Sequence, residues 1–140
     1  MKQMICTFFG LIGSVIATAL GGWDQGLATL LIFMGLDYGL GIIVAAVFHK
    51  SSKTITGTLE SKTCFKGLVK KCMVLVYVLV AYRLDVVIGT YYIRDAVIIA
   101  FIVNELISLT ENAGLMGVPL PPVITKAIDI LQKKSESEGE

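Results

Sequence analysis

Residues 26–48 read GLATLLIFMGLDYGLGIIVAAVF, and this run decides the fold class. A helix that crosses a bilayer needs about 20 mainly apolar residues, and this run exceeds that length with Asp37 as its one charged residue. Residues 21–25, GGWDQ, precede it as a tight turn whose Trp23 suits a membrane interface. The run therefore predicts a transmembrane helix.

Three more apolar segments flank this run, at about residues 4–20, 72–93 and 96–113. The whole chain is 55% hydrophobic and 16% charged, with a mean hydropathy of +0.78. Soluble domains are nearer 45–50% apolar and about 25% charged. We predict an all-α integral membrane protein with one domain over residues 1–140 and about four transmembrane helices. Because segment 96–113 is short and contains Asn104 and Glu105, three spans are the alternative.

The connection at residues 49–71 is basic, with six lysines against one acid, Glu60. Short loops rich in Lys and Arg stay in the cytoplasm, so four spans place both termini there too. We expect these lysines to contact anionic lipids as well. A cleaved signal peptide is a second interpretation of the N-terminal segment, since Ala17-Thr18-Ala19 resembles a cleavage site.

A further helix is expected after the last span, over about residues 122–134. Pro121 and Pro122 suit a helix start, and Ile124, Ala127, Ile128 and Leu131 share one face. We expect this amphipathic helix to lie on the cytoplasmic membrane surface or under the bundle, and residues 135–140 to form a flexible tail.

Motifs for catalysis or cofactor binding are missing from the sequence. It has no nucleophile elbow, phosphate loop or dinucleotide fingerprint, and its single histidine, His49, has no partner at metal-ligand spacing. The odd count of three cysteines argues against a disulfide framework. We therefore expect no enzyme activity, no metal, no cofactor and no nucleic-acid partner.

Ionisable and polar residues inside the apolar segments are the candidate functional residues. Isolated charges at such positions are costly unless they are paired or face water. At about 1.5 Å per residue, Asp37, Glu105 and Arg83 lie about 18, 16 and 13 Å below their outer helix ends. We therefore expect Arg83 to pair with Glu105 or Asp37. The set either joins helices within one subunit or lines the lumen of an oligomer; its members are Asp37, Arg83, Asp85, Asn104 and Glu105.

Small residues recur at helical spacing in the second segment. Gly35 and Gly39 form a G-x-x-x-G pair, and Gly41 and Ala45 continue the spacing. Such positions let helix backbones approach closely in a membrane. They predict close helix packing, within one subunit or between subunits.

Several motifs between Phe33 and Leu131 suggest a family. They are Asp37-Tyr38-x-x-Gly41, then residues 66–71 and 81–85, then Asn104-Glu105, Glu111-Asn112, and Gly117-x-Pro119-x-Pro121. In this order they resemble the bacteriophage holins of the toxin-secretion and phage-lysis type.

The resemblance implies a protein that oligomerises with itself in the bacterial cytoplasmic membrane. It then opens lesions that release an endolysin, or in some relatives a toxin. Two alternatives stay open: a small selective channel or transporter, and a regulator of the antiholin type that forms no pore.

Overall fold

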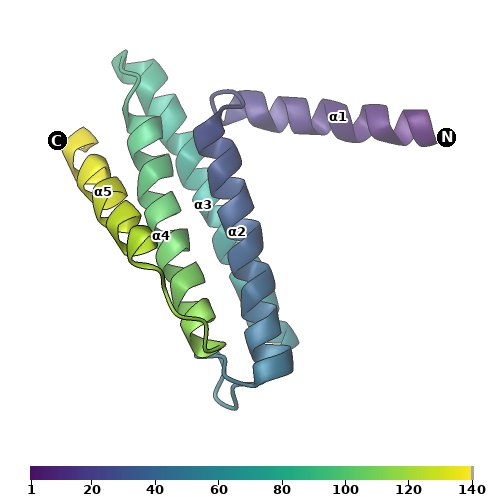
Figure 1. Cartoon of the computed structure of the whole chain (residues 1–140). Helices are drawn as coiled ribbons and strands as arrows, with labels where there is room; N and C mark the ends of the chain where they lie inside the picture. Colours follow the sequence, from purple (N-terminus) through teal and green to yellow (C-terminus); the bar gives the residue numbers. More distant parts are fainter. Residues whose placement is uncertain (140) are drawn as a thin grey trace.

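The computed structural model describes residues 1–139, and these residues form helices and no strand. Their order is α1 (Lys2–Ala19), α2 (Gln25–Ile43), the π-helix η1 (Val44–Phe48), α3 (Ser61–Ile88), α4 (Ile93–Leu115) and α5 (Pro122–Glu138). Helices α2, α3 and α4 form a three-helix bundle, α5 packs on α4, and α1 projects away from the bundle (Figure 1). The all-helical prediction is confirmed.

Local residues explain where these helices begin and end. The Asp24 carboxylate accepts the Leu27 N–H and caps the start of α2. Gly89 ends α3 with φ of +82°, a left-handed conformation that costs a glycine little. Pro122 lies in the first turn of α5, where a missing N–H costs no helical hydrogen bond.

The observed bounds differ from the expected segments in two places. Helix α3 begins at Ser61, so about three turns of the expected basic loop 49–71 are helical and the connection itself is residues 49–60. Lysine is a good helix former. A run of lysines therefore predicts that the segment contacts water, but it does not predict that the backbone forms a loop. Helix α5 continues to Glu138, which includes most of the expected flexible tail 135–140; residue 140 lies outside the described residues.

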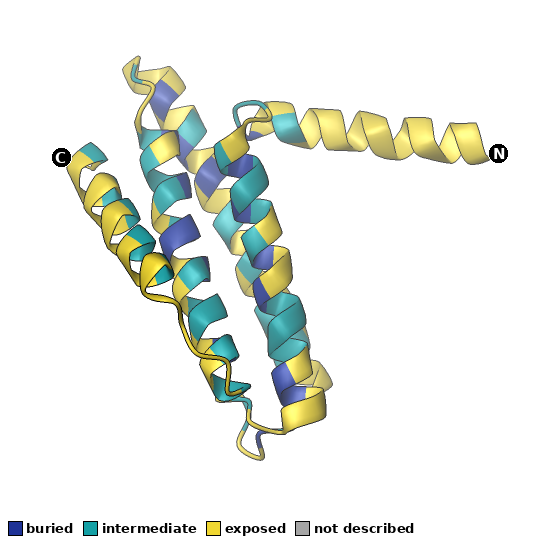
Figure 2. Ribbon diagram, in the orientation of Figure 1, coloured by how far each residue is buried: buried dark blue, intermediate teal, exposed yellow. Residues whose placement is uncertain are grey.

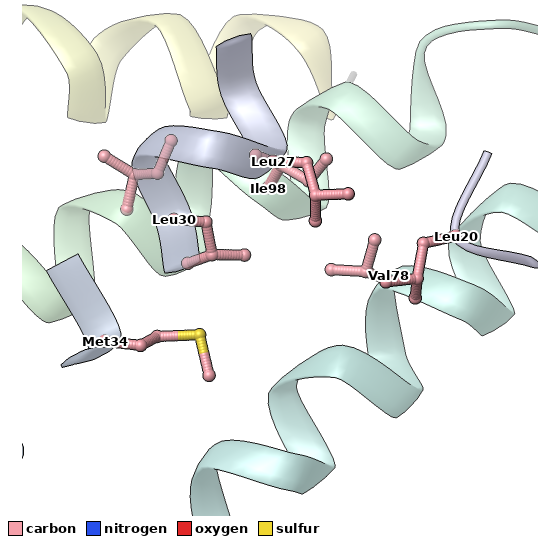
Figure 3. Packing of buried hydrophobic residues seen from close by; sticks show 7 residues of the cluster. Leu20, Leu27, Leu30, Met34, Val78 and Ile98 are labelled. Atoms are coloured by element: carbon pink, nitrogen blue, oxygen red, sulfur yellow. The ribbon is translucent and has the colours of Figure 1, made fainter. Parts of the chain in front are cut away.

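The core of the bundle is apolar at the end where α1 joins α2. Figure 3 draws this cluster and labels Leu20, Leu27, Leu30, Met34, Val78 and Ile98; Ile102 completes the cluster. Burying such side chains contributes about 1.5–3 kcal/mol each. Toward the other end of the bundle, polar side chains are buried beside apolar ones: Asp37, Glu105 and Asn112 lie in the interior, and Val44 and Ala45 are buried too.

Large apolar side chains also cover much of the outer surface. Every residue of α1 up to Ile16 is exposed, and Figure 2 shows the whole helix standing clear of the bundle. Helix α3 exposes Tyr77, Leu84 and Val87 at 55%, 44% and 78%. Contiguous apolar surface of this extent marks contact with lipid or with another protein.

Among residues 1–139, two helices are long and apolar enough to cross a membrane by length and composition. They are Lys2–Ala19, with a mean hydropathy of 1.4, and Gln25–Phe48, with 2.2. Helices α3 and α4 have 28 and 23 residues. At about 1.5 Å per residue, each is longer than the roughly 30 Å of a hydrocarbon core.

One of the two positions expected for the last helix is wrong, and the other, on the membrane surface, stays a prediction. Helix α5 does not lie under the bundle; it runs back along α4 toward the end where α1 meets α2 (Figure 1). Its Lys134 and Glu138 line a hollow together with Asp24 and Asp95 at that end. The face expected to be buried is nevertheless the one that packs, since Ile124, Ala127, Ile128 and Leu131 are its half-buried apolar residues.

Candidate functional site: a buried ion cluster between three helices

A cluster of charged side chains fills the polar part of the bundle interior. Lys71 of α3 donates hydrogen bonds to Asp37 of α2 at 2.8 Å and to Glu105 of α4 at 2.5 Å. The two carboxylate side chains are only 3% and 4% exposed, and the lysine is 16% exposed. One cation therefore bridges three helices through two buried anions.

Asn112 of α4 completes this cluster. Its side-chain amide donates to the Asp37 carboxylate at 3.0 Å, and the residue is 7% exposed. The contact leaves Asp37 with two donors, one charged and one neutral. A buried carboxylate needs such partners because its desolvation is otherwise uncompensated.

The formal charges of the ion cluster do not cancel. Lys71 contributes one positive charge, while Asp37 and Glu105 contribute two negative charges. Coulombic attraction is strong where water is scarce, so Lys71 binds both carboxylates tightly. Moving Lys71 away would leave two buried negative charges without a counter-charge, which is strongly disfavoured. The cluster can hold α2, α3 and α4 in one register.

The expected pairing of Arg83 with Glu105 or Asp37 is wrong. Arg83 is exposed on the outside of α3, and Lys71, three turns earlier on the helix, takes the place expected for it. Depth along a helix does not give direction around it, and Arg83 is on the wrong face. It lies five residues, about 7.5 Å, from the end of α3, so its long side chain can reach the membrane interface.

Asp85, also expected inside the membrane, has a local structural role. Its carboxylate accepts the Thr90 hydroxyl at 2.6 Å and the backbone N–H groups of Ile93 and Arg94 at 3.0 and 2.8 Å. These are free N–H groups at the start of α4, so Asp85 caps that helix from the end of α3. Asn104 is exposed on α4, outside the ion cluster.

Arg94 forms a second buried polar centre, which the sequence interpretation missed. It is 6% exposed and donates to the carbonyls of Leu20 and Gly22 at 2.5 and 2.9 Å, and to the Asp24 carboxylate at 2.6 Å. Arg94 thereby fastens the α1–α2 turn to the start of α4. In the sequence, Arg94 is a single arginine between two apolar segments, and it gave no signal of this role.

Asp24 lies in this turn, outside the long apolar helices. Partial burial tends to raise the pKa of its carboxyl group, but the hydrogen bond from the Leu27 N–H and the Arg94 guanidinium outweigh burial and hold that pKa below its ordinary range. Asp24 is therefore charged at neutral pH and stabilises the turn there. This contribution is lost only as pH falls through the lowered pKa.

The small residues expected to pack helices divide into two groups. A Cβ added at Gly35 or Gly39 would meet nothing within 4 Å, so this pair makes no close contact in one chain. Ala45 is buried, and a Cβ at Gly41 would approach Asn112 at 4.0 Å. Ala45 lies within the bundle, whereas Gly35 is exposed and borders a hollow between α2 and α3.

The remaining residues of the resemblance lie at the end of α4 and after it. Asn112 belongs to the ion cluster, while Glu111 is exposed on the same helix. Gly117 has φ of +83° just beyond α4, and Pro119 and Pro121 follow in the connection to α5. The glycine permits the turn that reverses the chain, and the prolines keep the connection extended.

Comparison with known proteins gives the family. The model of the bacteriophage holin family matches residues 14–133. The chain belongs to the bacteriophage holin family. This is a family of non-enzymatic membrane proteins, and together with the two apolar helices it indicates a membrane protein.

Relatives of this holin-family chain occur in bacteria and in a phage. An uncharacterised Listeria innocua protein is 36% identical over 129 residues, 91% of this chain and 86% of the relative. An uncharacterised Clostridium perfringens protein is 34% identical over 136 residues, 94% and 95% of the two chains. A probable holin of Bacillus phage phi105 is 27% identical over 112 residues, 79% and 77% of the two. No solved structure matches the chain.

Proposed function

We propose that this chain is a holin that oligomerises in the bacterial cytoplasmic membrane and opens lesions that release an endolysin or a toxin. Family membership and the relative described as a probable holin support the proposal. The observation that carries it is the buried ion cluster of Lys71, Asp37 and Glu105 inside otherwise apolar helices. Charges at such depth in a membrane protein are expensive and mark functional positions.

The proposed topology places the connection 49–60 and the start of α3 in the cytoplasm. Lys62, Lys66 and Lys70 are exposed at four-residue spacing on that part of α3, where they can contact anionic lipid headgroups. Helices α2, α3 and α4 then cross the membrane. Helix α1 crosses as a fourth span by turning about Gly21 and Gly22, because its apolar surface has no partner in the bundle.

The proposed assembly uses the outward face of α2. Gly35 and Gly39 leave open space on that face, which permits close approach of a helix from another copy. The ion cluster keeps each subunit intact while this contact forms. In this proposal Gly35 and Gly39 serve contacts between subunits, whereas Gly41 and Ala45 serve packing within one subunit. This division explains why only the second pair is packed within the chain.

The experiment that tests this function is inducible expression in a bacterium carrying a membrane-potential dye and a folded cytosolic reporter enzyme. A holin collapses the potential and releases the enzyme. A selective channel changes the potential and retains the enzyme, and an antiholin-type regulator does neither, so both of those outcomes contradict the proposal. Lys71→Met should prevent release, whereas Lys70→Met, an exposed neighbour on the same helix, should behave as the unchanged chain does.

The proposed topology has its own test. In a cysteine-free background, Ser52→Cys in the basic connection should resist a membrane-impermeant thiol reagent before lysis. Tyr91→Cys, in the α3–α4 turn where the side chain is 88% exposed, should react readily. The reverse pattern would overturn the orientation.

A further inference from the structure

The outward face of α5 carries a stripe of charge. Lys126, Asp129, Lys133 and Glu136 are spaced by three, four and three residues, which places them on one side of the helix. All four are exposed, and within residues 1–139 none of them forms an ion pair. We call these four residues the α5 charge stripe.

The half of the α4–α5 seam nearer the C-terminus carries polar side chains as well, beside apolar ones. Asn104 of α4 lines a hollow together with Gln132, Ser135 and Glu136 of α5, so the α5 charge stripe reaches the edge of this seam at Glu136. Farther along the same helix, Lys134 and Glu138 of α5 line a second hollow with Asp24 and Asp95. Water is the natural occupant of hollows lined by such side chains.

The outer surface of α3 has the opposite character. Val76, Tyr77, Val80, Leu84 and Val87 are exposed there at 44–78%. They recur at helical spacing and form an apolar surface of the kind that lipid covers. The chain therefore has one side suited to hydrocarbon and another, over α5, suited to water.

This division matters because α5 lies alongside α4, a helix proposed to cross the membrane (Figure 1). Lys126, Lys133 and Glu136 lie within five residues of an end of α5, but Asp129 lies seven residues, about 10 Å, inside it, and its short side chain cannot reach the interface. An unpaired charge facing lipid at that depth is strongly disfavoured, so the side of α5 that carries Asp129 must face water. We infer that α5 lines the aqueous lumen of the assembled protein, with α3 toward lipid and further copies of this chain closing the ring. The inference rests on the proposed holin function.

The charges of the α5 charge stripe indicate which class of molecule can pass through the lumen. Two lysines balance one aspartate and one glutamate, so the formal charge of the α5 charge stripe is zero. A ring of such helices presents both signs to the lumen, and it lacks the single-sign ring that makes a channel selective. This suits the passage of a folded protein with a mixed surface.

The test is the charge preference of the full chain in vesicles of zwitterionic lipid, each loaded with one cationic and one anionic dye. Lys126→Glu with Lys133→Glu changes the α5 charge stripe from zero to −4 and should shift release toward the cationic dye. Lys2→Glu with Gln3→Glu makes α1 more negative by three charges at two exposed positions outside the proposed lumen, and it should leave the ratio of the two dyes unchanged.

Failure of this inference differs from failure of the proposed function. If all three proteins release both dyes in the same ratio, the chain permeabilises membranes but α5 does not line the lumen. If the unchanged chain releases neither dye, the holin proposal fails and the inference fails with it.

A cross-link provides a second measurement. In a cysteine-free background, Asn104→Cys with Ser135→Cys should join α4 to α5 through a short bismaleimide in vesicles, and the linked protein should still release dye. Absence of the link, or loss of release once it has formed, would show that α5 leaves α4 in the membrane and would overturn the inference.

Discussion

Lys71→Met is the substitution whose effect can be worked out most directly. It removes the one cation of the ion cluster, which lies 2.8 Å from Asp37 and 2.5 Å from Glu105. Two carboxylates, each less than 5% exposed, then face each other without a counter-charge. Removing one partner of a buried ion pair costs about 3–5 kcal/mol. A tenfold change in an equilibrium constant is about 1.4 kcal/mol, so the folded population should fall by about 100-fold or more relative to the unfolded.

The assay is a titration of the detergent-solubilised protein with SDS, followed by the fluorescence of its one tryptophan, Trp23. Lys71→Met should unfold at a clearly lower SDS fraction than the unchanged protein. Lys70→Met is the matched control, and it should change the free energy of unfolding by less than about 1 kcal/mol because the side chain is exposed.

A combined variant separates charge from packing. Adding Asp37→Asn and Glu105→Gln to Lys71→Met removes every formal charge from the ion cluster. This triple variant should be more stable than Lys71→Met alone, since no unpaired charge stays buried. Equal unfolding midpoints for Lys71→Met and Lys70→Met would refute the structural role of the cluster.

Two further substitutions test the remaining polar contacts. Asn112→Leu removes the 3.0 Å hydrogen bond to Asp37 and should cost about 1–3 kcal/mol in the same titration; an unchanged midpoint would show that the contact contributes nothing. Gly21→Ala should lower the free energy of unfolding more than Gly22→Ala does. Both glycines have φ near +95°, so the backbone strain of the two changes is alike. A Cβ at Gly21 would lie 2.6 Å from the Arg94 side chain, whereas a Cβ at Gly22 would meet open space. Equal effects of the two changes would mean that the Arg94 contact does not restrict this turn.

The sequence predicts the helical class because hydropathy is a local property. The run containing Asp37 is apolar for a full membrane width, and the two prolines at 121 and 122 mark the start of a helix in any context. The apolar face of α5 was predictable for the same reason, since 3.6-residue periodicity is read within one segment. These features need no knowledge of neighbouring helices.

The ion cluster was only partly predictable. The two buried acids, Asp37 and Glu105, were identified by their cost in an apolar segment, but their cation was not. Lys71 seemed to belong to a basic loop because it follows Lys70, although only one of this pair points inward. Direction around a helix depends on tertiary packing, and spacing along the chain does not supply it.

The sequence does not predict the position of α5 or the role of Arg94. An amphipathic helix fits a membrane surface and a neighbouring helix equally well, so its pattern alone does not choose between them. Arg94 contacts Leu20, Gly22 and Asp24, which lie 70 or more residues earlier in the chain. No local pattern reports contacts over that separation.

The most direct measurement of the central claim uses the purified full-length chain in vesicles that hold both a small dye and a folded enzyme. No other phage or bacterial protein is then present. The holin proposal predicts that the dye and the active enzyme both appear outside, and that Lys71→Met releases neither while Lys70→Met releases both. Release of the dye with complete retention of the enzyme would contradict the proposal and identify a small channel instead.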